Sequence, residues 1–250
     1  AVTSTYVAGT GVWTASGAVA DVNVLLAGVT FNPAANFNAN FTVASNVSDG
    51  VAAALTGTKS VTGTAVNDAP TASNLSAADP YTEDTALNLV DIVATDVDGI
   101  VSATLTLSNP AAGSLSTATS GAVTSTYVAG TGVWTAPSGA IADVNVLLAG
   151  VTFTPAANSS VNFTIATSVS DGVAPAVTGT KTMNGTAVND APTATNLSTA
   201  DPYTEDIPLN LVDIVVTDVD SANATATLTL SNTAAGALST ATSGAVTSTY

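Results

Sequence analysis

The sequence predicts an all-β fold, in which β-sandwich domains follow one another end to end and each domain carries one short helix. Long blocks recur: AVTSTYVAGTGVWTA at 1–15 returns at 122–136, and its first six residues return at 245–250. Runs rich in Val and Thr, which favour strands, lie between clusters of Gly, Pro, Asn, Asp and Ser. Hydrophobic residues make up 46% of the chain, more than disordered acidic chains contain.

The recurring blocks divide the chain. The repeat distance, 121 residues and then 123, is too long for a solenoid repeat and suits a whole domain. We expect linkers at 65–71 and 187–193, where AVNDAPT occurs twice, because proline fixes φ and holds the preceding residue extended. The sequence therefore predicts the C-terminal half of a domain at 1–68, a complete domain at 69–190 and the N-terminal half of a third at 191–250. We expect the chain to be an excerpt of a longer array.

Strands are expected where apolar residues alternate with polar ones or form short runs. Residues 87–93, 103–107, 161–166 and 177–180 have such patterns. A complete domain would hold roughly seven to nine strands in an up-and-down sandwich. Trp134, the only tryptophan between 69 and 190, is expected to pack in the core.

One segment has a helical pattern. Between residues 138 and 150, Ile141, Val144, Leu147 and Leu148 follow helical spacing. Gly150 suits the position that follows the last residue of a helix. The pattern predicts a short helix of about two turns that joins two strands.

The chain is acidic, with a net charge of −16 and only two basic residues, Lys59 and Lys181. Because it contains neither His nor Cys, disulfides, a tetrahedral zinc site, a thiol nucleophile and an imidazole base are excluded. Two lysines cannot neutralise a phosphate backbone, so nucleic acid is not expected as a partner. An anionic membrane surface would repel the chain, and no apolar run is long enough for insertion. The acidic bias favours cations as partners.

Acidic motifs recur in a fixed order. NDAP at 67–70 is followed by TED at 82–84, DVD at 96–98 and SDG at 170–172, and NDAP at 189–192 is followed by TED at 204–206 and DVD at 218–220. This set resembles the inter-domain joints of bacterial cadherin-like repeats in giant secreted adhesins, including those of the repeats-in-toxin class. The resemblance covers the whole chain and implies an Ig-like sandwich, calcium at the joints and a surface-exposed mechanical role. Ser221 and Ile207 replace Gly99 and Thr85 of the preceding copy, while the carboxylates are kept.

The order of the strands predicts where these acids meet. In an up-and-down sandwich alternate loops lie at the same pole, so one joint should contain Asn67, Asp68, Asp96, Asp98 and Asp171. The opposite pole should contain Glu83, Asp84, Asn189, Asp190, Asp218 and Asp220. Neither set is expected to be complete. The first lacks the Glu-Asp pair of a preceding domain, and the second lacks the Ser-Asp-Gly loop of the third domain.

Such a cluster needs a counter-ion. Two like charges about 5 Å apart repel by about 3 kcal/mol at an effective dielectric constant near 20. Ca²⁺ accepts six to eight oxygen ligands in irregular cages and fits better than Mg²⁺. We therefore expect calcium to hold successive domains in a stiff rod. The alternative interpretation is that the acids are ordinary turn residues and solvated charges.

The favoured function is a structural extender, or spacer, of a large extracellular adhesin or surface fibre. Its expected partners are neighbouring repeats and, in a fibre, like chains at the cell surface. The alternatives are a carbohydrate-binding module and a self-assembling filament subunit whose chains dock through their incomplete halves. An enzyme is not expected, because Glu83 and Asp98 would lie at opposite poles, too far apart for glycoside hydrolysis.

Three further residues receive plain structural interpretations. Asp79 is expected in a turn, and Lys59 and Lys181 are expected on strands with their side chains facing solvent. A Lys–Asn isopeptide cross-link at either lysine is the alternative interpretation.

Overall fold

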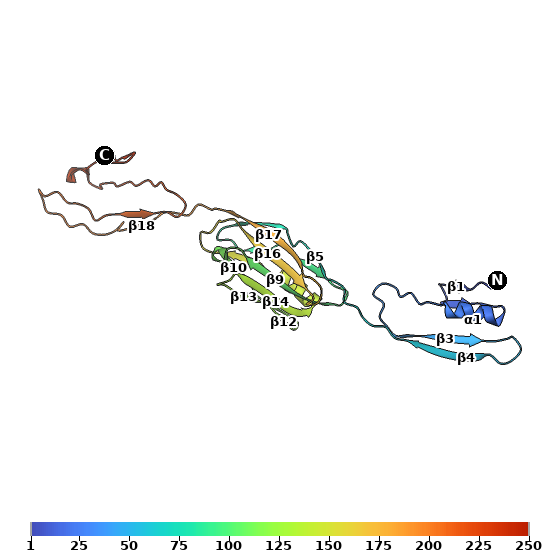
Figure 1. Cartoon of the computed structure of the whole chain (residues 1–250). Coiled ribbons are helices and arrows are strands. Elements are labelled where there is room, and N and C mark those ends of the chain that lie inside the picture. Colours follow the sequence, from blue (N-terminus) through green and yellow to red (C-terminus); the bar gives the residue numbers. More distant parts are fainter. Residues whose placement is uncertain (1, 250) are drawn as a thin grey trace.

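The computed structural model describes residues 2–249, so the outermost residue of the predicted units 1–68 and 191–250 lies outside the described range. Three sections follow one another along the molecule, with the two termini at opposite ends (Figure 1). We call them the N-terminal section (residues 2–68), the middle section (69–190) and the C-terminal section (191–249). The division into repeats at these boundaries stays a prediction.

The middle section is an all-β sandwich with one α-helix. Its six-stranded sheet consists, in spatial order, of β13 (Thr126–Val128), β14 (Val133–Ala140), β9 (Ile100–Leu107), β16 (Phe163–Ser170), β17 (Val177–Thr186) and β6 (Ala78–Thr82). The facing three-stranded sheet consists of β10 (Gly113–Leu115), β15 (Thr152–Pro155) and β7 (Leu87–Asn88). Short pairs are formed by β5 (Thr71–Ser73) with β8 (Val93–Thr95) and by β11 (Thr119–Ser120) with β12 (Val123–Thr124), and η1 (Pro110–Ala112) precedes β10.

Side chains between the two sheets form one core. Trp134 on β14 is completely buried, which confirms its predicted place, and its indole N–H donates to the carbonyl oxygen of Ser116 at 2.9 Å. The ring of Tyr81 on β6 lies 5.1 Å from Phe153 on β15 and 6.0 Å from Phe163 on β16, measured between centroids. Tyr81 and Phe153 thus connect the two layers. Every buried residue between positions 2 and 249 belongs to the middle section.

The predicted helix is confirmed as α2 (Ile141–Ala149). Val144, Leu147 and Leu148 are buried, because helical spacing places them on one face. The side chain of Asn145 accepts a hydrogen bond from the N–H of Ala94 and donates one to its carbonyl, both at 2.9 Å. These two bonds fix α2 against β8.

The predicted strand at 87–93 is wrong in its continuity, since residues 89–92 separate β7 from β8. The N–H of Val90 donates to the Asp79 carboxylate at 2.6 Å, and its carbonyl accepts from Lys181 at 2.8 Å. Backbone groups that bind side chains cannot also continue a strand ladder. The middle section has thirteen strands, β5 to β17, more than the seven to nine predicted. The up-and-down arrangement is also wrong at one edge, where β6 pairs parallel with β17.

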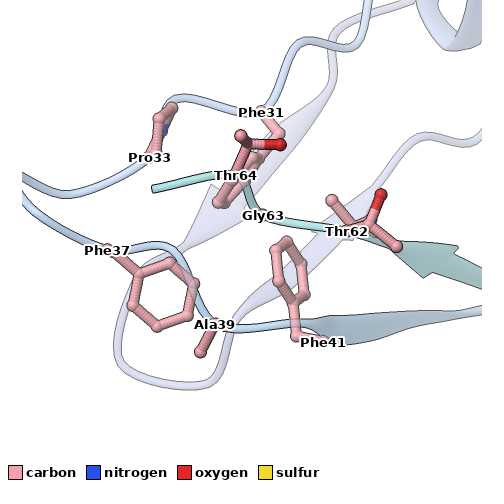
Figure 2. A pocket seen from close by; sticks show the side chains of 9 residues that line it. Phe31, Pro33, Phe37, Ala39, Phe41, Thr62, Gly63 and Thr64 are labelled. Carbon is pink, nitrogen blue, oxygen red and sulfur yellow. The ribbon is translucent and has the colours of Figure 1, made fainter. Parts of the chain in front are cut away.

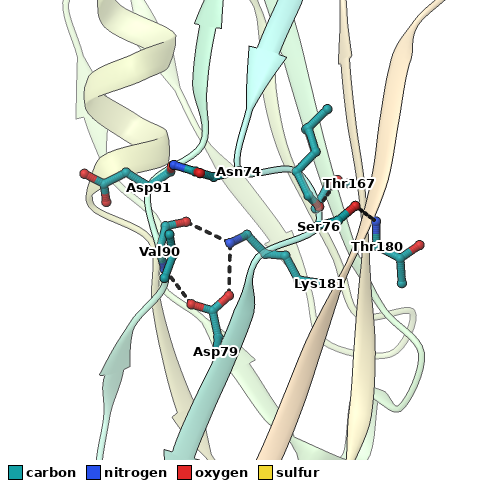
Figure 3. A network of polar contacts seen from close by, with 9 residues as sticks. Asn74, Ser76, Asp79, Val90, Asp91, Thr167, Thr180 and Lys181 are labelled. Atoms are coloured by element: carbon teal, nitrogen blue, oxygen red, sulfur yellow. Dashed lines mark hydrogen bonds and ion pairs between the residues drawn. The ribbon is translucent and has the colours of Figure 1, made fainter.

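The prediction of a turn at Asp79 is wrong, since Asp79 lies on β6, and Lys181 lies on a strand as predicted but does not face solvent. Figure 3 shows the two side chains facing each other, with Lys181 Nζ 3.0 Å from Asp79 Oδ2 and both groups buried. Lys181 faces the core because inward and outward positions alternate along β17, and it shares its phase with buried Met183. The described partners of Nζ are Asp79 and the carbonyl of Val90. No asparagine is among them, so they give Lys181 no isopeptide partner.

The two end sections repeat parts of the middle section. The N-terminal section contains β1 (Thr5–Val7), β2 (Val12–Thr14), α1 (Val19–Ala27), β3 (Phe41–Val47) and β4 (Leu55–Val61). The C-terminal section contains β18 (Thr193–Thr195), β19 (Val215–Thr217), η2 (Thr233–Ala235), β20 (Thr242–Ser243) and β21 (Val246–Thr247). None of residues 2–68 or 191–249 is buried, so the apolar faces of both end sections are open. Over the described range, no helix has the length and apolarity to cross a membrane.

Candidate metal centre

The first acidic cluster lies where the linker enters the middle section. We define joint 1 as Asn67, Asp68, Asp96, Asp98 and Asp171. The side-chain amide of Asn67 donates to Asp171 Oδ2 at 2.7 Å, and the backbone N–H of Asp68 donates to Asp98 Oδ2 at 2.9 Å. The linker is therefore bound to two separate loops of the middle section.

The second acidic cluster lies where the next linker leaves the middle section. We define joint 2 as Glu83, Asp84, Asn189, Asp190, Asp218 and Asp220. The N–H of Asp190 donates to Asp220 Oδ2 at 2.7 Å, and the N–H of Val188 donates to Glu83 Oε1 at 2.7 Å. One carboxylate oxygen from each of Glu83, Asp190 and Asp220 lies within 4.8 Å of the other two. Joint 2 thus gathers acids from the middle section, the linker and the C-terminal section.

Both joints use the same loop geometry. In joint 1 the N–H of Asp98 donates to Asp96 Oδ1 at 2.7 Å, and in joint 2 the N–H of Asp220 donates to Asp218 Oδ1 at 2.9 Å. Asp side chains commonly bind the backbone two residues further on and so close a turn. This turn leaves the carboxylate of Asp98 or Asp220 free to accept the N–H of the linker.

The two joints differ in which acids they contain. Joint 1 includes Asp171 but no glutamate, whereas joint 2 includes Glu83 and Asp84 but no counterpart of Asp171. The side chain of Asp84 accepts the N–H of Asn158 at 3.0 Å. The two sets are complementary parts of one larger set of oxygen donors.

Each joint contains one buried carboxylate oxygen without a hydrogen-bond partner among the described residues. These atoms are Asp96 Oδ2 in joint 1 and Asp190 Oδ2 in joint 2. A buried acceptor left unpaired carries the cost of lost hydration. A hard cation with oxygen ligands would remove that cost, and the donors of both joints are oxygen atoms, which Ca²⁺ prefers. The residues present therefore fit calcium.

One carboxyl group in each joint has a shifted pKa, and the two shifts have opposite directions. The pKa of Asp171 is lowered from its ordinary value of 3.8, first by the hydrogen bond from Asn67 and then by N–H groups of its own loop. The pKa of Asp190 is raised from 3.8, first by burial and then by the negative charges of Asp220 and its neighbours. Negative charge in joint 2 is therefore poorly compensated by the protein itself.

These two pKa shifts predict that Asp171 and Asp190 contribute to folding stability with opposite dependences on pH. Because the pKa of Asp171 is lowered in the folded chain, its contribution to stability is present above pH 3.8 and is lost as the pH falls through the folded pKa. The contribution of Asp190, whose pKa is raised, is present below pH 3.8 and is lost as the pH rises through the folded pKa. A carboxyl-carbon NMR titration without calcium should show Asp190 titrating at higher pH than Asp171.

A variant separates the causes of the raised pKa. Asp220→Asn should bring the pKa of Asp190 down towards its ordinary value, because one neighbouring negative charge is removed. The pKa of Asp171, which lies in the other joint, should stay where it was. Equal pKa values for Asp171 and Asp190 in the unchanged chain would contradict the prediction.

The role of the eleven residues of joints 1 and 2 as metal ligands stays a prediction. The spacing of acidic motifs could not reveal the backbone groups that bind Glu83 and Asp84, since those groups belong to Val188 and Asn158. Glu83 and Asp98, the pair considered for glycoside hydrolysis, belong to different joints.

The aromatic side chains of the middle section are mostly unavailable for sugar stacking. Tyr81, Trp134, Phe153 and Phe163 are buried, and Tyr127 is partly buried with its hydroxyl donating to the carbonyl of Gly113. Carbohydrate-binding surfaces use exposed aromatic faces with polar neighbours. The aromatic side chains of the middle section therefore do not favour a carbohydrate-binding module.

Comparisons with known proteins find similarity only among solved structures. No protein-family model and no curated protein matches the chain. Protocadherin gamma B2 extracellular cadherin domains 3–6 match over 73% of this chain with 14% identity and a TM-score of 0.36. A protocadherin gammaB7 EC3–6 cis-dimer structure matches over 73% with 14% identity and a TM-score of 0.33. Protocadherin gamma B2 domains 1–5 match over 88% with 15% identity and a TM-score of 0.34.

The matched chains are longer than this one. The aligned region covers 44%, 43% and 38% of their lengths, respectively. At these TM-scores the similarity assigns no function to this chain.

Proposed function

We propose that this chain is part of a structural extender of an extracellular adhesin or surface fibre, and that calcium at joints 1 and 2 holds its successive sections in line. The observation that carries the proposal is the trio Glu83, Asp190 and Asp220, whose oxygens lie within 4.8 Å of one another. Asp190, a member of this trio, has a buried Oδ2 without a hydrogen-bond partner among the described residues. An ion bound there would connect the middle section, the linker and the C-terminal section.

The hydrogen-bonding groups and the carboxylates of each joint have different roles. Asn67 and the backbone N–H groups of Asp68 and Asp190 orient carboxylates of the adjoining loops through hydrogen bonds. These bonds limit the angles that each linker can adopt. Burial, and after it the repulsion among the carboxylates, raises the pKa of Asp190. Bound calcium would supply positive charge that offsets this repulsion.

The proposed location follows from calcium affinity. Extracellular calcium modules bind with dissociation constants of about 10⁻⁴–10⁻³ M. Sites of that strength are occupied where calcium is millimolar, so we place the protein at the cell surface. Its immediate partners are then neighbouring repeats of the same kind.

Chelation tests the proposal. Adding EDTA to the 250-residue chain in millimolar calcium should shorten its maximum dimension in small-angle X-ray scattering, because the joints bend more freely. The melting temperature should fall as well, since millimolar calcium, at about 1 to 10 times such a dissociation constant, stabilises the state that binds it by about 0.4–1.4 kcal/mol. If chelation changed neither the maximum dimension nor the melting temperature of the chain, the result would contradict the proposal.

A variant and its matched control test whether the calcium response depends on joint 2. Asp190→Asn should abolish the calcium dependence of joint 2, because it removes the central carboxylate of the trio. Asp91→Asn removes the same charge from an exposed residue outside both joints and should keep the response to calcium. A calcium response that is identical in both variants would place the ion elsewhere.

A further inference from the structure

We propose that Asn184 is a site of spontaneous deamidation, the conversion of its carboxamide to a carboxylate, and that the folded chain holds this site closed. Two features close it. β17 is paired with β6, and the N–H of Gly185 donates a hydrogen bond to the side chain of Asn162. The proposal concerns the chemistry of one dipeptide, and it depends neither on calcium nor on the role of a spacer.

Asn184 and Gly185 form the only Asn-Gly dipeptide in the sequence. Asparagine is one of the chemically labile residues. It reacts fastest before glycine, because a residue without a side chain leaves its backbone nitrogen open to the neighbouring carboxamide. Asn184 is exposed on β17, and none of residues 2–249 forms a hydrogen bond with its carboxamide. The reacting side chain is therefore accessible to water and is not restrained by a partner.

The reaction needs no reagent other than water. The nitrogen of Gly185 gives up its proton and bonds to Cγ of Asn184, whose amide nitrogen takes up a proton and leaves as ammonia. Water then opens the resulting five-membered imide at one of its two carbonyl groups. The product is aspartate or isoaspartate, and in isoaspartate the main chain runs through the former side chain and is one carbon atom longer.

Backbone packing requires glycine at position 185. A Cβ atom on Gly185 would collide with the carbonyl group of Ser160. The counterpart in the N-terminal section is Gly63, where a Cβ atom would collide with the backbone of Asn38. Figure 2 shows Gly63 next to Thr62 in the wall of a pocket. The need for glycine thus occurs in both sections, but only the middle section places asparagine before it.

The strand conformation keeps the two reacting atoms apart. β17 ends at Thr186, and its parallel pairing with β6 sets Asn184 opposite Pro80 and Gly185 opposite Tyr81. Ring closure requires a rotation about ψ of Asn184 that brings the nitrogen of Gly185 to Cγ. A residue held in the extended conformation of a strand cannot make that rotation while it stays in the ladder. β17 must therefore detach locally before Asn184 can react.

The side chain of Asn162 restrains the attacking nitrogen. The N–H of Gly185 donates to Asn162 Oδ1 at 2.9 Å, which keeps the proton on the nitrogen and fixes the plane of the peptide group. The N–H of Gly63 donates to Asn40 Oδ1 in the same way at 3.0 Å. This hydrogen bond therefore has a structural role in both sections, and in the middle section it also blocks the first step of deamidation.

Isoaspartate at position 184 would make an opening of β17 irreversible. The residues that follow it hold the end of the strand: the carbonyl of Thr186 accepts the N–H of Glu83 at 3.0 Å, and the N–H of Val188 donates to Glu83 Oε1 at 2.7 Å. An additional main-chain carbon would displace both groups from Glu83. A strand that has opened and reacted could not recover its register with β6.

Mass spectrometry of the 250-residue chain tests the site and its closure. The two basic residues are Lys59 and Lys181, so trypsin releases a peptide that begins at Thr182 and contains Asn184. At mildly alkaline pH, Asn184 should deamidate at least about tenfold faster in denaturing urea than in buffer, a factor that corresponds to about 1.4 kcal/mol of protection. Equal rates would overturn the closure, and no reaction in urea would overturn the site.

Asn162→Ala tests the hydrogen bond to Gly185. In buffer it should raise the deamidation rate of Asn184 by about 2- to 10-fold, the effect of losing one hydrogen bond. In urea the rate should equal that of the unchanged chain, because the dipeptide itself is the same. Asn40→Ala removes the corresponding bond to Gly63 and is the matched control. Equal rates in the two variants in buffer would overturn the role of Asn162, and a circular dichroism melt checks that both variants fold.

Refolding tests the consequence of the reaction. After removal of urea, the isoaspartate form, identified by electron-transfer fragmentation, should melt at a lower temperature than the unreacted chain. Asn184→Asp introduces the same charge without the additional main-chain carbon and should refold to the melting temperature of the unchanged chain. An isoaspartate form that regains that melting temperature would overturn the irreversible step.

Discussion

Replacing Asp79 with alanine is expected to destabilise the middle section by about 3–5 kcal/mol, because it leaves a buried ammonium group without its counter-ion. Lys181 would keep one described partner, the carbonyl of Val90, in a position with no solvent exposure. The N–H of Val90 would lose its acceptor as well. Urea unfolding of the 250-residue chain, followed by circular dichroism in dilute solution, measures the loss.

A double variant identifies the cause. Adding Lys181→Met to Asp79→Ala should restore most of the lost free energy of unfolding, because an apolar side chain needs no counter-ion in the core. Lys59→Met is the matched control. It makes the same change at the exposed counterpart and should leave the unfolding of the middle section unchanged. If the double variant were as unstable as Asp79→Ala, the unpaired charge would not be the cause.

Replacing Trp134 with alanine is expected to cost about 3–5 kcal/mol, the range for removing a large aromatic side chain from a packed core. Trp134 is completely buried, and it lies opposite Leu105 on β9 and Tyr127 on β13. Its removal would open a cavity in the core of the middle section. The carbonyl of Ser116 would also lose the indole N–H that it accepts. Urea unfolding again gives the difference in free energy.

The second tryptophan of the chain provides the control. Trp13 has the same cross-strand neighbour type, Tyr6, but lies on the open N-terminal section. In dilute solution Trp13→Ala should change the unfolding free energy by less than about 0.5 kcal/mol, as expected for a site outside a packed core. Similar losses for the two variants would show that the core is not concentrated in the middle section.

Local sequence patterns were sufficient to predict a helix or a strand where the environment of a residue follows from its near neighbours in the sequence. The spacing of Val144, Leu147 and Leu148 predicted α2, and the alternation along β9 and β16 predicted strands at those places. The same alternation on β17 could have indicated that Lys181 faces inwards, because it lies two residues before Met183. The lysine side chain was instead interpreted as exposed, on the general preference of charged groups for solvent.

The break at Val90 required knowledge of distant residues. The pattern of residues 87–93 predicts one strand, whereas Lys181, which donates to the carbonyl of Val90, lies 91 positions from it in the sequence. The side chains of Asp79 and Lys181 take both backbone groups of Val90 out of the sheet. Short-range periodicity contains no information about such a contact.

The sequence by itself determined that long blocks recur along a β-rich chain and that its acids occur in a fixed order, and it predicted the helix α2. Those properties depend on periodicity and composition, which are read along the chain. Only the tertiary structure decided that Asp79 and Lys181 form a buried pair, and that Glu83, Asp190 and Asp220 lie within 4.8 Å of one another. The physical reason is that these groups lie far apart in the sequence, 30 residues for Asp190 and Asp220 and 102 for Asp79 and Lys181, so folding alone determines which charges must share a site with little water.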